Sequence, residues 1–226
     1  MRINVLTIFP DYLEGPLSFS IPGRAREAGL VEYHVIDLRD YTHDRHRTTD
    51  DEPFGGGGGM VMKPEPFFEA LEALGPAGPI VSLTPRGRPF DHEAAIRLAL
   101  EGEVTLLCGR YKGIDERVAE RWVTEEVSIG DYVLSGGEPA ALVVIDAIVR
   151  LLPGALGDHD SASSDSFYDR QLSAPIYTRP AEYADLTVPE ALRSGDHERI
   201  ARWREARSKE ATQRVRPDLL DLDAAD

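Results

Sequence analysis

The sequence is poor in cysteine, in long apolar runs and in positive charge, and each shortage excludes a class of protein. The single cysteine, Cys108, excludes an internal disulfide and is typical of a reducing compartment. The longest apolar stretch, residues 140–149, contains Asp146 and is too short to cross a bilayer. The N-terminus has no pattern of a secretory signal. We therefore expect a cytoplasmic protein with no membrane partner.

The formal net charge of −15 argues against a protein that coats nucleic acid non-specifically. One segment differs from this acidic background, because basic residues outnumber acidic ones between Arg193 and Arg216. Such a segment is either a solvated helix or a local footprint for a specific anionic partner. Composition alone favours the solvated helix.

Apolar runs alternate with helical patterns through the first two thirds of the chain. The predicted strands are residues 3–9, 31–38, 80–83, 104–108 and 122–127. The predicted helices are residues 64–74, 91–100, 114–121 and 138–151, the second of them capped by Asp91. This alternation indicates the α/β class, with a mainly parallel sheet that is covered on both faces.

The character of the chain changes after Pro153. Residues 154–173 are rich in Gly, Ser, Asp and Ala without sustained periodicity, which predicts a flexible linker. Helical patterns follow at residues 188–193 and 196–215, with Asp196 as the cap of the second, and a short turn follows Pro217. A helical unit of about fifty residues forms a poor core alone, so we expect it to lean on a partner surface.

Three glycine-containing loops directly follow predicted strands, at residues 83–87, 108–116 and 128–139. Ligands of open α/β sheets bind beyond the carboxyl ends of the strands, so these loops predict one shared pocket. Glycines there let the backbone approach a flat ligand and offer N–H and C=O groups to it. The spacing fits neither the dinucleotide fingerprint nor a P-loop. For any one loop, a tight turn between packed elements is the alternative.

A fourth loop, residues 41–51, precedes a run of glycines at 55–59. It contains His43, Asp44 and His46, but no third firm ligand stands at metal-like spacing, and the neighbouring arginines oppose a cation. We therefore expect no metal site. Arg45, Arg47 and the paired threonines are instead typical phosphate-binding donors, with a solvated surface turn as the alternative.

Several blocks together resemble the bacterial tRNA (guanine-N1)-methyltransferase family, in order and along nearly the whole chain. The blocks are residues 42–51, the glycine run with Met60, residues 108–117, residues 128–138, Asp165-Ser166-Phe167, Tyr177-Thr178-Arg179-Pro180 and Arg202-Trp203-Arg204. Blocks of this length make the resemblance specific.

The resemblance implies the SPOUT class of fold, an α/β domain whose mainly parallel sheet carries a deep trefoil knot, followed by a small α-helical C-terminal domain. It places the catalytic domain at residues 1–157, a flexible linker at 158–175 and the helical tRNA-binding domain at 176–226. It also implies a homodimer in which both chains contribute to each active site.

S-adenosylmethionine is the methyl donor that the resemblance implies, and a Mg²⁺ ion without dedicated protein ligands is compatible with it. Carried over position by position, the expected cofactor-binding residues are Leu83, Thr84, Pro85, Gly109, Tyr111, Gly113, Ile129, Gly130, Asp131, Tyr132, Val133, Leu134, Gly136, Gly137 and Pro139.

The activity implied is methylation of N1 of the guanosine immediately 3′ to the anticodon. Guanine N1 carries a proton, so transfer of the methyl group needs a base within hydrogen-bonding distance. The resemblance assigns this role to Asp165, and it assigns stabilisation of the charge that develops on guanine O6 to Arg150. From the residues alone, Asp165 is an ordinary linker acid and Arg150 is a charge at a helix end.

The expected tRNA-binding residues are Arg45, His46, Arg47, Arg202 and Arg204. Arginine contacts to phosphates would offset the unstacking of the target guanine and would make binding depend on salt. The match of the C-terminal block to the family reverses the preference for a merely solvated helix.

One departure from the family lies in the second glycine loop, where Lys112 stands at a position that is commonly acidic. Its ammonium group could repel the amino group of the cofactor or attract its carboxylate. Two alternative functions remain open, a SPOUT methyltransferase that acts on another RNA base and a non-catalytic RNA-binding protein that senses S-adenosylmethionine.

Overall fold

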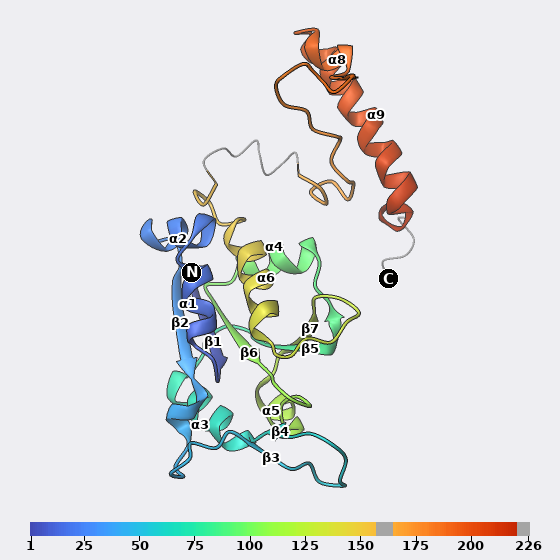
Figure 1. Ribbon diagram of the computed structural model, residues 1–226. Coiled ribbons are helices and arrows are strands. Elements are labelled where there is room, and N and C mark those ends of the chain that lie inside the picture. Colours follow the sequence, from blue (N-terminus) through green and yellow to red (C-terminus); the bar gives the residue numbers. More distant parts are fainter. Residues whose placement is uncertain (157–164, 221–226) are drawn as a thin grey trace. The chain divides into compact units, whose positions relative to one another are not determined.

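The structure is a computed structural model that describes residues 1–156 and 165–220. The chain divides into two compact units, Met1–Gly157 and Asp158–Asp226 (Figure 1). The predicted linker begins in residues 157–164, which lie outside the described part of the chain.

The first unit is built on a five-stranded sheet in the order β2-β1-β6-β5-β7, and every pairing in it is parallel. The strands are β1 (Arg2–Thr7), β2 (Glu32–Asp37), β5 (Ile80–Pro89), β6 (Glu103–Cys108) and β7 (Glu125–Ser128). The prediction of a mainly parallel sheet is confirmed. The strands that precede the three glycine loops, β5, β6 and β7, are neighbours in this sheet, so their carboxyl ends meet at one edge.

Helices cover both faces of the sheet. Successive residues of a buried strand point to opposite sides, so each face of the sheet presents apolar side chains that the helices bury. In β6, Leu106 packs into one apolar cluster and Leu107 into the other. The Leu106 cluster includes residues from α1 (Asp11–Leu17), α2 (Ser20–Glu27), α4 (His92–Ala99) and α6 (Glu138–Val149), and α6 contacts the other three helices (Figure 1). The Leu107 cluster includes residues from the 3₁₀ turn η1 (Leu38–Tyr41), α3 (Pro64–Leu74) and α5 (Glu116–Trp122).

Local capping signals explain where several helices begin. The carboxylate of Asp91 accepts a hydrogen bond from the backbone N–H of Ala94, as the sequence predicted for the start of α4. The range predicted for α3 matches the observed helix, and its first residue is Pro64. Proline fits this position because its missing N–H would have no partner in the first turn.

Strand β5 and the helices α1 and α2 of the first unit differ from the prediction. Strand β5 was expected to end at Leu83, but it continues to Pro89 after a shift of register between Leu83 and Arg88. Helices α1 and α2 were not predicted, because residues 11–27 contain the helix-breaking residues Gly15, Pro16, Pro22 and Gly23. Tertiary packing overrides these local preferences. A Cβ at Gly23 would lie 2.3 Å from the carbonyl oxygen of Ser18, so glycine lets the two helices meet closely.

The second unit contains a short hairpin, β8 (Glu182–Tyr183) with β9 (Leu186–Thr187), followed by α8 (Glu190–Arg193), α9 (His197–Val215) and the 3₁₀ turn η2 (Pro217–Leu219). The helices and the turn occupy the region where the sequence predicted them. Asp196 caps α9, and its carboxylate accepts the backbone N–H groups of Glu198 and Arg199. Among the described residues of α9, Thr212 alone is buried.

Within residues 1–156 and 165–220, no helix combines the length and the apolar character needed to cross a membrane.

We expect Leu106→Ala to lower the free energy of unfolding by about 2–5 kcal/mol, because Leu106 is fully buried in the central strand. The matched control is Leu100→Ala at the end of α4, where the side chain is 83% exposed; it should change stability by less than about 0.5 kcal/mol. Urea denaturation followed by circular dichroism compares the two variants. Equal midpoints would contradict the assignment of β6 to the core.

Candidate functional site

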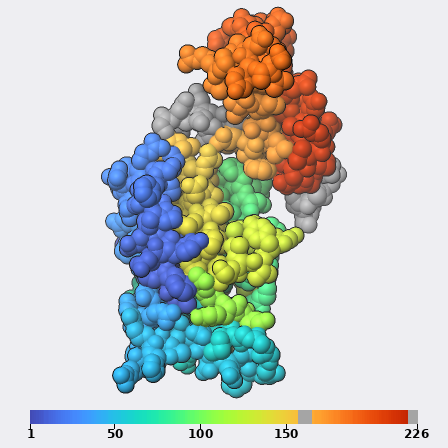
Figure 2. Space-filling view, viewed as in Figure 1, coloured from blue at the N-terminus to red at the C-terminus, as the bar shows by residue number. Residues whose placement is uncertain are grey.

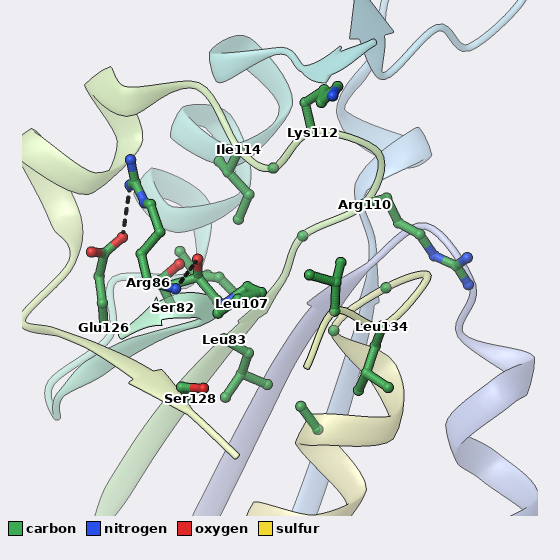
Figure 3. A pocket seen from close by; sticks show the side chains of 18 of the residues that line it. Ser82, Leu83, Arg86, Leu107, Arg110, Lys112, Ile114, Glu126, Ser128 and Leu134 are labelled. Carbon is green, nitrogen blue, oxygen red and sulfur yellow. Dashed lines mark hydrogen bonds and ion pairs between the residues drawn. The ribbon is translucent and has the colours of Figure 1, made fainter. Parts of the chain in front are cut away.

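A cavity of about 730 Å³ opens at the carboxyl ends of β5, β6 and β7. Its walls come from the three glycine loops that the sequence singled out, together with the end of the glycine run at Gly59 and Met60 (Figure 3). Sheet order explains the convergence, because neighbouring parallel strands deliver the segments that follow them to the same edge.

The first wall is an interruption in β5. Leu83 and Arg88 both pair with Val127 of β7, so residues 84–87 leave the ladder between these two points. Gly87 closes this bulge, since a Cβ there would lie 2.3 Å from the backbone nitrogen of Val127. Thr84 and Pro85, carried on the released segment, line the cavity.

The second wall follows β6 and turns sharply. Tyr111 and Gly113 both have positive φ, at 58° and 121°, which makes glycine the favoured residue at the second position. The short strand β4 (Val61–Met62), which pairs with β3 (Asp50–Asp51), holds this turn from outside. The N–H of Lys112 donates to the carbonyl of Met60, and the N–H of Met62 donates to the carbonyl of Gly113, each at 3.0 Å.

The third wall runs from β7 to α6 and crosses the end of β6. The N–H of Gly137 donates to the carbonyl of Gly109 at 2.8 Å. A Cβ on Gly137 would lie 2.7 Å from the Cα of Cys108, a distance that main-chain atoms cannot accommodate. Earlier in the loop, Gly130 has a φ of 149°, and the ring of Tyr132 lies against it.

A buried ion pair fixes the junction of the second and third walls. The side chain of Glu138, the first residue of α6, is fully buried, and its Oε1 accepts a hydrogen bond of 2.7 Å from the hydroxyl of Thr7. Its Oε2 lies 3.2 Å from Nε of Arg110, whose guanidinium also stacks 4.2 Å from the ring centroid of Phe9. Removing one partner of such a pair typically costs about 3–5 kcal/mol.

The remaining charges of the cavity lie in its outer wall. Arg86 donates to Glu116 at 3.0 Å and to Glu126 at 3.1 Å, the second contact being visible in Figure 3, and these hydrogen bonds raise the pKa of Arg86. Lys112 also lines the cavity, and the described residues offer it no ion-pair partner. Cys108, the last residue of β6, is fully buried, and this burial raises the pKa of its thiol well above the ordinary value, as for an unreactive structural cysteine.

Most of the residues expected to bind the cofactor line this single cavity. They are Leu83, Thr84, Pro85, Gly109, Tyr111, Gly113, Ile129, Gly130, Tyr132, Val133, Leu134, Gly136 and Gly137. Asp131 and Pro139 do not line it; Asp131 is exposed, and Pro139 occupies the first turn of α6. Four charged residues of the site, Arg86, Arg110, Glu126 and Glu138, were not expected from the sequence, because charged side chains near glycines look like ordinary surface residues.

The loop at residues 41–51 lies on the surface of the first unit (light blue in Figure 2), with Arg45, His46 and Arg47 exposed. Asp44 organises it by accepting the N–H of His46 and both the N–H and the hydroxyl of Thr48. These hydrogen bonds, chiefly those from Thr48, lower the pKa of Asp44. Arg47 forms an ion pair with Asp40.

The two expected catalytic residues belong to different units. Arg150 is the C-cap of α6 in the first unit. Asp165 lies in the second unit and lines a separate cavity of about 970 Å³. Arg204 of α9 lines that second cavity too, whereas Arg202 is exposed on the same helix.

The described residues contain no group of three or more His, Cys, Asp or Glu side chains that could hold a metal ion. His43 contacts Glu69 instead, with its Nε2 2.8 Å from a carboxylate oxygen.

Comparison with known proteins identifies the family. The sequence pattern described as tRNA (Guanine-1)-methyltransferase TrmD matches residues 1–222. A tRNA (guanine-N(1)-)-methyltransferase of Geobacter sulfurreducens is 52% identical, over 97% of this chain and 91% of the relative. The enzyme of the same name from Frankia alni is also 52% identical, over 97% of this chain and 85% of the relative. That from Bacteroides fragilis is 50% identical, over 98% of this chain and 100% of the relative.

The parallel sheet, the glycine-lined cavity at its carboxyl edge and the match over nearly the whole chain agree, and the chain belongs to the tRNA (guanine-1)-methyltransferase family.

Proposed function

We propose that this protein transfers a methyl group from S-adenosylmethionine to N1 of the guanosine immediately 3′ to the anticodon of tRNA, in the cytoplasm. The observation that carries the proposal is the glycine-lined cavity where β5, β6 and β7 end, in a chain of this family. A single fully buried cysteine suits the reducing conditions of that compartment.

The cavity fits a nucleoside-sized methyl donor. A volume of about 730 Å³ lies within the usual range for small-molecule sites. Its glycines expose main-chain donors and acceptors for a purine ring, while Leu83, Ile129 and Leu134 supply apolar contacts. We assign donor binding to the cavity-lining residues named above, with Asp131 and Pro139 acting through the conformation of the third wall.

The reaction requires a proton to leave guanine N1 as the new N–CH₃ bond forms. In our proposal the carboxylate of Asp165 accepts that proton, and N1 attacks the methyl carbon in line with the sulfur. The C–S bond breaks, and its electron pair stays on sulfur as the neutral thioether. Arg150 stabilises the negative charge that develops on guanine O6. We assign Asp165 and Arg150 to the same target guanine, one to its N1 proton and the other to its O6.

Recognition of tRNA is assigned to two basic surfaces, Arg45, His46 and Arg47 on the first unit and Arg202 and Arg204 on α9. Extruding the target guanine costs a few kcal/mol, and phosphate contacts from these side chains offset it. Arg47 exchanges its partner Asp40 for a phosphate when RNA binds.

Three further properties complete the proposal. A homodimer supplies each active site from two chains, which gives the C-terminal unit the partner surface that its small core needs. The segments around residues 83–87, 109–113 and 129–137 form a trefoil knot, as in other members of the SPOUT class. A Mg²⁺ ion assists without dedicated protein ligands.

The function is tested with two tRNA transcripts that differ in one nucleotide, with G or A immediately 3′ to the anticodon. We expect methylation of the first transcript only, measured by transfer of radiolabelled methyl and mapped by primer extension. Equal activity on both would favour an enzyme for another base. Binding of S-adenosylhomocysteine without methylation of either would favour a sensing protein.

Asp165→Asn should lower kcat by about 10²–10⁴-fold, because an amide cannot accept the N1 proton. Affinity for S-adenosylhomocysteine, measured by calorimetry, should stay within two-fold of that of the unmodified protein, since the donor cavity lies in the other unit. The matched control is Asp169→Asn, an acid that lines the same second cavity and should leave turnover unchanged. Normal turnover in the Asp165 variant would remove Asp165 from the mechanism.

Lys112→Ala should weaken binding of S-adenosylhomocysteine by about five-fold, the effect of a charge pair worth about 1 kcal/mol near a surface. The physical reason is attraction between its ammonium group and the carboxylate of the ligand. 5′-Methylthioadenosine lacks that carboxylate and should bind both proteins equally, and Lys112→Arg should retain the affinity. Tighter binding of S-adenosylhomocysteine to Lys112→Ala would indicate that Lys112 repels the amino group instead.

A further inference from the structure

Helix α9 buries one side chain among its described residues, and that side chain is polar. Thr212 is fully buried, and its hydroxyl donates to the carbonyl of Ser208 at 2.8 Å. The same oxygen accepts the backbone N–H of Leu172 at 2.9 Å. A threonine inside a helix usually satisfies itself on the preceding turn, so the second contact is the informative one. It joins α9 to a segment forty positions earlier in the chain.

Ser208, one turn before Thr212, also contacts Leu172, at its carbonyl instead of its N–H. Its hydroxyl donates to the carbonyl of Leu172 at 2.6 Å and lies 3.3 Å from the side-chain oxygen of Gln171. Both main-chain hydrogen-bonding groups of Leu172 therefore end on hydroxyls of α9. Two contacts to one peptide segment fix its orientation as well as its position, much as a strand partner would.

The segment held in this way is a loop that is closed between Ser166 and Ser173, directly after Asp165. The N–H of Phe167 donates to the carbonyl of Gln171 at 2.7 Å, and the N–H of Ser173 donates to the hydroxyl of Ser166 at 2.9 Å. At the far end, the guanidinium of Arg216 lies 5.9 Å from the ring centroid of Phe167. These contacts fix residues 166–173 to α9, and Asp165 directly precedes them in the chain.

An arginine of α9 lies close to this loop. Arg204, Ser208 and Thr212 are spaced four residues apart, so they form one stripe along the helix. Arg204, Ser208 and Asp165 also line the same cavity of the second unit. Arg204 has no ion-pair partner among the described residues, so its guanidinium is available to a phosphate.

We propose that Ser208 and Thr212 are positioning residues. They hold the loop that follows Asp165 on α9, so that the Asp165 carboxylate moves together with the tRNA-binding helix. The proposal rests on the function proposed above for Asp165. A phosphate held by Arg204 then sets the distance from the RNA backbone to the carboxylate. Binding of tRNA by α9 therefore also brings the Asp165 carboxylate to the guanine.

The two hydroxyl contacts of Ser208 and Thr212 to Leu172 form a clamp on the loop. This clamp affects the chemical step more than the affinity for tRNA. Displacing a reacting group by about 1 Å can cost roughly 10²-fold in rate, whereas the phosphate contacts of α9 do not depend on the hydroxyl of Thr212. Loss of the clamp should therefore lower kcat and leave KM for tRNA nearly unchanged. A purely structural role would instead lower affinity, helicity and kcat together.

The test compares Thr212→Val with Thr212→Ser in the full chain. Valine keeps the shape of threonine but leaves the N–H of Leu172 without its acceptor, whereas serine restores the hydroxyl. Ser208→Ala removes the other half of the clamp, and Thr187→Val, at an exposed threonine in β9, is the matched control. The measurements are kcat and KM with the G-containing transcript, the Kd for S-adenosylhomocysteine and the thermal melt by circular dichroism.

We expect kcat to fall about 10–100-fold in Thr212→Val and Ser208→Ala, with KM for tRNA and the Kd within about two-fold, and to recover in Thr212→Ser. Normal kcat in both variants would overturn the proposal, and so would a parallel loss of tRNA affinity and helicity in both. Asp165→Asn, assayed beside them, separates the two ideas. If that variant keeps its turnover, the base assignment fails; if it is inactive while both clamp variants are normal, only the clamp fails.

Discussion

The cavity of the first unit depends on one close contact, in which the chain at Gly137 touches the end of β6. The space beside the Cα of Cys108 admits no side chain there, and the N–H of Gly137 completes the contact by donating to Gly109. The next residue, Glu138, enters the core between Thr7 and Arg110. The consecutive residues Gly137 and Glu138 thus hold the third wall against the second wall. The pocket between the two walls is a consequence of this packing.

The two units divide the proposed chemistry between them. The first unit offers a cavity at the edge of a parallel sheet that has an apolar cluster on each face. The second unit is different in kind, because α9 has little buried surface and holds its neighbouring loop by hydroxyl groups. A donor cavity in one unit and the proposed proton acceptor in the other suit a reaction whose large substrate must enter before water is excluded.

Much of this architecture could be predicted from the sequence, and the failures have physical causes. Apolar strands, helix α3 with its first-turn proline, the capped helices α4 and α9 and the three glycine loops are local signals, and they were found. The continuation of β5 was missed because Thr84, Pro85 and Gly87 look like a turn, while pairing with β7 restarts the strand after the bulge. The partnership of Arg110 with Glu138 was missed because burial depends on tertiary packing. Nothing local marks Asp165 or Arg150, and their assignment comes from the family.

The glycine-rich walls of the cavity also determine how easily a mutation could weaken the binding of an inhibitor. A competitor that binds through the main-chain groups of residues 109–113 and 129–137 has few side-chain contacts that a single mutation could delete. Substituting Gly136 or Gly137 would place a Cβ within 2.4 or 2.7 Å of neighbouring atoms, so those changes damage the pocket itself. Point mutations can remove contacts only where side chains line the cavity, as at Leu83, Ile129, Leu134, Arg86 and Lys112. A compound that binds chiefly through main-chain groups should therefore lose the least affinity to such mutations.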